Sequence, residues 1–148
     1  MANTKTDTIV PLLSFLGGEQ VVGELRTADA LETRLRNGLP FRALERLMES
    51  AQLSREQAVK LFGVAPRTFV RRKNTGTLTF EEANRVVQFA DLFAFAAHVF
   101  GKREGAARWL QMPNPYLGGL APIDRLDNAL GRKAVLEELN RIAYGMLA

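Results

Sequence analysis

A Ser-Arg-Glu-Gln run that begins at Ser54 is the sequence feature that most constrains the fold of this chain. Its serine and Gln57 have the spacing of a capping box, in which each side chain binds the backbone N–H of the other residue. Gly63 is placed to end the helix that follows, and Pro66 suits the first turn of another helix. Because two short helices joined by a glycine-containing turn are typical of a helix-turn-helix, we predict this motif over residues 53–74.

The second helix of this motif is expected to present a polar face to nucleic acid. A small core that locks the two helices together is predicted at Val59, Phe62, Val64 and Phe69. The candidate DNA-binding residues are Arg67, Thr68, Arg71, Arg72 and Lys73. Arginine binds phosphate oxygens, and it also reads the O6 and N7 atoms of guanine with two donors. We expect base contacts from Arg67 and Thr68, near the helix N-terminus, and backbone contacts from Arg72 and Lys73.

The positive charge of the chain is concentrated in this motif. The net charge is +4 and the isoelectric point is near 9.8. Between Arg55 and Lys73 there are six basic residues and a single acid, so the remaining residues are close to neutral together. A basic helix can simply be a solvated surface, but a local excess of charge on a capped helix pair favours DNA binding.

The chain before and after the motif also shows helical patterns, so we predict an all-α fold. Apolar residues at helical spacing indicate helices over residues 27–36 and 40–51. Thr79 and Glu82 form a second capping-box pattern, and the helix behind it is expected to run to Phe100. This helix is apolar around nearly its whole circumference, so we expect the core, a second domain or another subunit to cover it. We expect a homodimer.

A smaller helical region is predicted for the C-terminal part of the chain. A short helix near residues 106–110 precedes a loop rich in proline and glycine at residues 112–119. Pro122 is expected to open a further helix that Gly131 ends. The inward positions of that helix are predicted to be Ile123, Leu126 and Leu130. The last helix carries an apolar stripe of Val135, Leu139 and Ile142.

Composition argues against several other classes of protein. The chain has no cysteine, and its apolar run at residues 9–16 is too short for a membrane helix, so we expect a cytoplasmic protein without membrane contact. The sole histidine, His98, lies in the most apolar predicted helix, where a position in or beside the core is expected. The sequence lacks a phosphate-binding glycine loop. We therefore predict no enzymatic activity, no catalytic residue, no metal and no cofactor.

Several C-terminal segments resemble a known family. They are ARWL at residues 107–110, PN at 113–114, LGG at 117–119, Pro122 and RIAYG at 141–145. Their order and spacing are similar to those of the toxin-binding domain of Xre/MbcA/ParS antitoxins. In that family the domain follows an Xre-like helix-turn-helix that ends in an R-R-x-x-x-G-x-L element, and RRKNTGTL at residues 71–78 occupies that place. The resemblance covers about residue 39 to the C-terminus.

The resemblance implies a type II toxin–antitoxin system and a three-part chain. The partner would be a Res-type toxin that depletes NAD, and the antitoxin would cover its active site. Binding to operator DNA in the promoter of its own operon would repress transcription. The implied parts are an N-terminal segment at 1–38 that is a candidate for dimerisation, a DNA-binding domain at 39–101 and a toxin-binding domain at 102–148. The implied toxin contacts are Trp109, Asn114, Tyr116, Leu117, Arg132, Leu139, Ile142, Tyr144 and Met146.

Other interpretations stay open at this point. Without the family, Trp109 and Tyr116 are more often core anchors than contacts, and the loop between them can be a rigid connector. The chain can also be a helix-turn-helix transcription regulator whose C-terminal domain dimerises or senses a ligand. In addition, the family usually has Leu-Ala where this chain has Ala58-Val59, which would place a branched residue where the two helices cross.

Overall fold

The computed structural model describes residues 4–72 and 76–145, and in these ranges the chain forms helices and turns without a β-sheet. The predicted all-α class is confirmed. Two compact units are present, Met1–Ala94 and Phe95–Ala148. The predictions for Lys73 and Met146 lie outside the described residues. No helix within the described ranges is long and apolar enough to cross a membrane.

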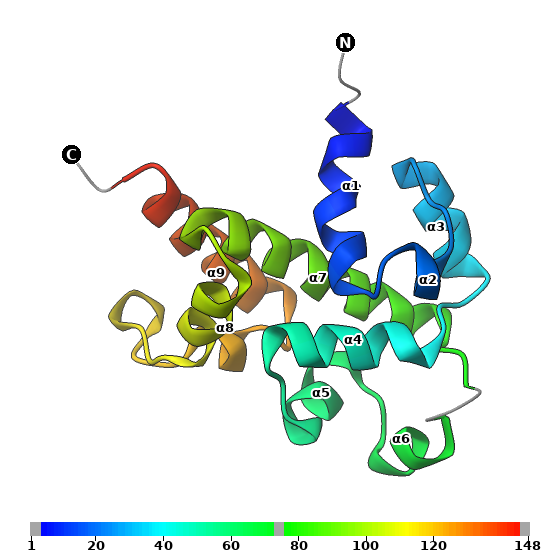
Figure 1. The fold of residues 1–148 in the computed structure, drawn as a ribbon. Coiled ribbons are helices and arrows are strands. Elements are labelled where there is room, and N and C mark those ends of the chain that lie inside the picture. Colours follow the sequence, from blue (N-terminus) through cyan, green and yellow to red (C-terminus); the bar gives the residue numbers. More distant parts are fainter. Residues whose placement is uncertain (1–3, 73–75, 146–148) are drawn as a thin grey trace. The chain divides into compact units, whose positions relative to one another are not determined.

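The first unit is built around helix α4, Phe41–Ala51 (Figure 1). On one side lie α1, Thr4–Phe15, α2, Glu19–Val22, and α3, Ala28–Arg36. On the other side lie α5, Arg55–Phe62, and α6, Pro66–Arg72. The long helix α7, Phe80–Phe100, begins in this unit. The predicted N-terminal segment therefore packs as part of the helix-turn-helix unit, with α1 contacting α4.

Both predicted capping boxes are confirmed. Ser54 Oγ accepts a hydrogen bond from the Gln57 N–H at 3.1 Å, and the Ser54 N–H donates to Gln57 Oε1 at 3.0 Å. At the start of α7, the Thr79 N–H donates to Glu82 Oε1 at 2.8 Å and the Glu82 N–H donates to Thr79 Oγ1 at 3.2 Å. Gly63 ends α5 with a φ of 67°, a left-handed conformation that favours glycine. Local signals thus determine where these helices begin and end.

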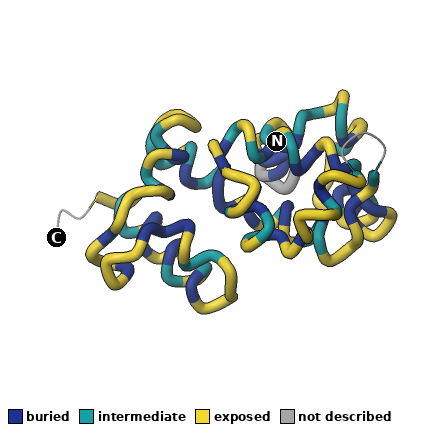
Figure 2. The backbone as a smooth tube through the Cα atoms, turned by 90° about the horizontal axis from the view of Figure 1, so that it is seen from below, coloured by how far each residue is buried: buried dark blue, intermediate teal, exposed yellow. Residues whose placement is uncertain are grey.

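Aromatic rings form the core beneath the helix-turn-helix. Phe69 of α6 packs edge-on against Phe41 of α4, with ring centroids 5.3 Å apart. Phe62 of α5 packs in the same manner against Phe89 of α7, at 5.7 Å. Buried residues recur along the helices, while exposed residues lie between them and in the turns (Figure 2). This pattern is the one expected of amphipathic helices around a shared core.

Four predicted side-chain positions were wrong, and one of them is Leu126, which was expected to face inward but is half-buried. Val59 is only half-buried, because the adjacent Ala58 is the residue that is fully buried in α5. A small side chain therefore occupies the buried position, and the branched residue lies at its edge. His98 is exposed, so it lies outside the core in or beside which it was expected. Leu130 is 79% exposed, although it was expected to face inward.

The second unit contains α8, Arg103–Gln111, the short 3-10 turns η1, Pro115–Leu117, and η2, Pro122–Arg125, and helix α9, Ala129–Ala143. The helix predicted to begin at Pro122 is only the turn η2, and Gly131 lies inside α9. Asn128 instead begins α9, since its side chain accepts a hydrogen bond from the Gly131 N–H at 2.8 Å. A Cβ on Gly131 would lie 1.8 Å from the Arg125 carbonyl oxygen. This glycine therefore permits close approach of η2 and α9.

Candidate nucleic-acid interface and partner-binding surface

Helix α6 presents two cations to solvent. Arg67 and Arg71 are both exposed, and neither forms an ion pair with another residue of the described ranges. Val70 between them is 71% exposed, while Thr68 is half-buried. The outward face of the predicted recognition helix thus offers two long donors with room to reach phosphates or base edges.

The adjacent Arg72 has a different environment. Its guanidinium forms an ion pair with the Glu82 carboxylate in the first turn of α7. The side chains of Arg72 and Glu82 are 21% and 13% exposed. Arg72 therefore faces the protein, which does not fit the predicted contact with the DNA backbone.

A further cation lies beside α6 that the sequence prediction omitted. Arg55 is exposed in the first turn of α5, and its guanidinium carbon lies 5.8 Å from the centroid of the Phe69 ring. The available signal was its place in the basic window of residues 55–73, one residue after the cap Ser54. Arg55 extends the cationic surface from α6 to the start of α5.

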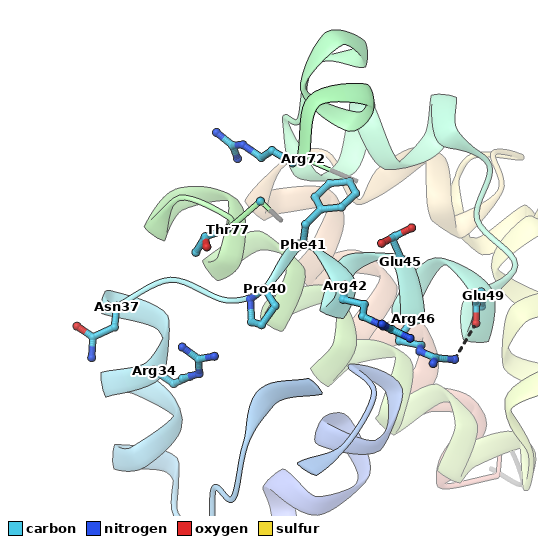
Figure 3. Close-up of a pocket in the computed structure, with 11 residues that line it drawn as sticks. Arg34, Asn37, Pro40, Phe41, Arg42, Glu45, Arg46, Glu49, Arg72 and Thr77 are labelled. Carbon is cyan, nitrogen blue, oxygen red and sulfur yellow. Dashed lines mark ion pairs between the residues drawn. The ribbon is translucent and has the colours of Figure 1, made fainter. Parts of the chain in front are cut away.

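A polar groove of about 620 Å³ lies where the end of α3, the start of α4 and residues 76–77 meet (Figure 3). Its charged lining residues are Arg34, Arg42, Glu45, Arg46, Glu49 and Arg72. Three of these arginines have partners within the protein. Arg34 donates to the carbonyls of Val22 and Gly38, Arg46 pairs with Glu49 at 3.5 Å, and Arg72 pairs with Glu82. The groove is therefore lined by charges of both signs, and three of its four arginines are bound by other groups of the first unit.

In the second unit, Asn114 organises the loop between α8 and α9. Its side-chain oxygen accepts a hydrogen bond from the Tyr116 N–H at 2.8 Å. Its carbonyl accepts from the N–H groups of Leu117 and Gly119, each at 3.0 Å, and its own N–H donates to the Leu120 carbonyl at 3.0 Å. Asn114 is 8% exposed. It therefore holds the loop in shape from inside and offers little surface to a partner.

A buried carboxylate connects this loop to α9. Glu138 is 5% exposed and accepts hydrogen bonds from Nε and one terminal nitrogen of Arg141, at 2.7 and 2.6 Å. The amide of Asn114 lies 3.5 Å from the same carboxylate. The Arg141 hydrogen bonds lower the pKa of Glu138 and raise the pKa of Arg141. This pair holds the Arg141 guanidinium over the Tyr116 ring, 3.7 Å from its centroid.

Exposed apolar side chains gather on this loop and at the end of α9. Met112, Tyr116 and Leu120 are 53%, 66% and 50% exposed, and Tyr144 is 85% exposed one helical turn beyond Arg141. Aromatic residues, methionine and arginine are enriched at protein interfaces. The loop and the end of α9 thus carry side chains suited to contact another protein. The sequence prediction named Tyr116 and Tyr144 but omitted Arg141, Met112 and Leu120.

Other predicted contacts of this unit are buried or half-buried. Leu139 is fully buried and Leu117 is 2% exposed, so both serve the core. Trp109 is half-buried and packs on Phe100, with ring centroids 5.5 Å apart. Arg132 and Ile142 are also half-buried. Apolar spacing alone did not separate these core positions from the surface.

The fold and these two surfaces define a helix-turn-helix DNA-binding protein with a separate C-terminal interaction domain. Residues 30–91 match the family described as the antitoxin Xre-like helix-turn-helix domain, and residues 95–145 match the antitoxin Xre/MbcA/ParS C-terminal toxin-binding domain. The chain belongs to the Xre antitoxin family. It is 32% identical over 128 residues to an Antitoxin Xre of Pseudomonas putida, covering 84% of this chain and 77% of that protein. It is 26% identical over 120 residues to an Antitoxin Xre of Photorhabdus laumondii, covering 80% and 81% of the two chains.

Family membership confirms the two functional halves expected from the sequence. The helix-turn-helix match contains α4, α5 and α6, and the toxin-binding match contains the loop and the end of α9 described above. DNA and a toxin are therefore the two partners that these domains imply. The first match also begins earlier than the resemblance in the sequence suggested, inside α3.

Proposed function

We propose that this chain neutralises a Res-type toxin that consumes NAD, by covering the active site of the toxin with its C-terminal domain. The exposed side chains of Met112, Tyr116, Leu120 and Tyr144, together with the half-buried Arg141 guanidinium that lies over the Tyr116 ring, are the observation that supports toxin binding by this domain. Central aromatic and arginine side chains contribute most of the binding free energy in many interfaces. The action is by binding, and no catalytic step on this chain is involved.

The toxin-binding half can be tested with the product of the adjacent gene. Co-expression should restore growth and cellular NAD when the antitoxin is wild-type. A variant with Tyr116→Ala and Tyr144→Ala should lose at least tenfold in toxin affinity, which corresponds to about 1.4 kcal/mol. Leu130→Ala is the matched control, because it removes an exposed apolar side chain from the opposite end of α9. If the tyrosine variant protects cells as well as the wild-type chain does, these side chains are not the toxin-binding surface.

We also propose that the first unit binds the promoter of its own operon and represses transcription. The support is the pair of exposed arginines on α6, Arg67 and Arg71, together with Arg55 at the start of α5. Because both the promoter and NAD are cytoplasmic, the proposed function would be carried out in the cytoplasm. Binding as a homodimer would match a two-fold symmetric operator, as is usual for helix-turn-helix proteins.

A reporter fused to the promoter tests autorepression. Arg71→Ala should raise reporter activity and should reduce the salt dependence of DNA binding by about one counterion. Leu130→Ala again serves as the control, now for an unrelated surface of the chain. Light scattering of the free protein tests the dimer. Reporter activity that does not depend on Arg67 and Arg71 would count against α6 as the operator-binding helix.

A further inference from the structure

The recognition helix ends at an ion pair that the proposed DNA binding does not explain. Arg72 is the last residue of α6, and its partner Glu82 belongs to the first turn of α7. Both side chains are mostly buried. In Figure 3 the Arg72 side chain extends away from Arg42 and Arg46, although all three line the same groove.

The capping box at the start of α7 also holds the Glu82 side chain in place. The same oxygen, Oε1, accepts hydrogen bonds from the Thr79 N–H and from the Arg72 guanidinium. The Glu82 N–H in turn donates to Thr79 Oγ1. The capping box therefore aims the carboxylate toward the end of α6, and little side-chain entropy is lost when Arg72 binds.

The backbone at Gly76 also contacts Arg72. The Gly76 N–H donates to the Arg72 carbonyl at 3.1 Å, and the Gly76 carbonyl accepts from the Phe41 N–H at 2.9 Å. A Cβ on Gly76 would lie 2.2 Å from Arg72 Cβ and 2.6 Å from Arg72 Cα, so glycine is required here. Leu78 is 1% exposed, and its N–H donates to the Leu39 carbonyl at 2.7 Å. Arg72, Gly76 and Leu78 of the R-R-x-x-x-G-x-L element thus all form contacts that hold the end of α6 and the start of α7 against neighbouring segments.

We propose that Arg72 and Glu82 are positioning residues that hold the C-terminal end of the recognition helix for DNA binding, while the neighbouring Arg71 contacts DNA. In the described part of the chain helix α6 has seven residues, Pro66–Arg72, and a helix of this length would be marginal alone. Phe69 anchors its middle against Phe41, and the ion pair anchors its end against α7. This inference rests on the proposed binding of DNA by α6.

The Glu82→Gln variant distinguishes a positioning role of Arg72 from direct contact between Arg72 and DNA. The two roles predict different changes in the affinity for promoter DNA. The glutamine keeps an oxygen for the Thr79 N–H but removes the charge that holds Arg72. If Arg72 positions α6, this variant should bind promoter DNA about tenfold more weakly, although it has lost a negative charge. If Arg72 contacts phosphate directly, removing the acid should leave the affinity unchanged or increase it. The latter result would overturn the proposal.

A double-mutant cycle and amide hydrogen exchange complete the test. The effects of Arg72→Ala and Glu82→Gln should not add, because both remove the same ion pair. Without DNA, each should speed amide exchange in residues 67–72 severalfold, while Arg71→Ala should not. If the wild-type chain fails to bind its promoter, the proposed function fails, yet exchange still tests the ion pair. Unchanged exchange in both variants would refute the positioning role.

Discussion

Substituting Gly131 with alanine provides the strictest test of the C-terminal unit. Glycine inside a helix ordinarily costs about 0.5–1 kcal/mol relative to alanine, so helix propensity alone predicts a gain in stability. Here the added Cβ would lie 1.8 Å from the Arg125 carbonyl oxygen and 2.8 Å from its carbon. These are backbone atoms of η2, and a rotamer change cannot move them away.

The expected net effect is destabilisation by about 2 kcal/mol. Overpacking of a close contact typically costs about 1–3 kcal/mol, and the cost here belongs at the upper end because α9 and η2 must separate. Such separation would also release Asn128, whose side chain accepts the Gly131 N–H. Toxin affinity should fall with stability, whereas DNA binding by the first unit should be retained.

Trp109 supplies a specific probe for this measurement. It is the sole tryptophan and packs on Phe100 within the second unit, so its fluorescence reports unfolding there. The denaturant midpoint of Gly131→Ala should fall clearly below that of the wild-type chain. Gly105→Ala in α8 is the matched control, because its Cβ would lie 3.2 Å from the Phe100 Cβ and needs only a small adjustment. Identical midpoints for Gly131→Ala and wild type would refute the close approach.

Three further outcomes are expected. Because the Arg141 hydrogen bonds lower the folded-state pKa of Glu138 below 4.5, their stabilisation is present above that pH and is lost as the pH falls through the lowered pKa. Trp109 fluorescence should show this loss of stability in the second unit as the pH is lowered. Glu138→Gln should reduce this dependence of stability on pH. Phe69→Ala should destabilise the first unit by about 3–5 kcal/mol, measured by helical circular dichroism during denaturation, and a cost below 1 kcal/mol would contradict its core role. Asn114→Ala should weaken toxin binding by loosening the loop, as measured by calorimetry, although the exposed residues are unchanged.

The start and end of many helices could be predicted from the sequence because their causes are local. A capping box involves residues three positions apart, as at Ser54 and Thr79, and Gly63 needs only its own backbone conformation. Gly131 shows the limit of such reasoning. A glycine after an apolar stripe is typical of a helix end, but here the packing of η2 requires it inside α9.

The roles within the toxin-binding domain were harder to predict. Leu117, Leu139, Tyr116 and Tyr144 all belong to family-like segments, and the sequence alone treats them alike. Packing buries the two leucines and leaves the two tyrosines exposed. Arg141 became part of the candidate surface only when the structure showed its guanidinium held over Tyr116 by Glu138.

The sequence by itself determined the helical class, the position of the helix-turn-helix and the concentration of charge upon it, since these depend on spacing and composition. The tertiary structure decided which side chains of that helix are available. Arg71 and Arg72 are chemically identical neighbours, but successive residues of a helix point about 100° apart. One guanidinium therefore reaches solvent, and the other meets Glu82, which the fold brings to the end of α6.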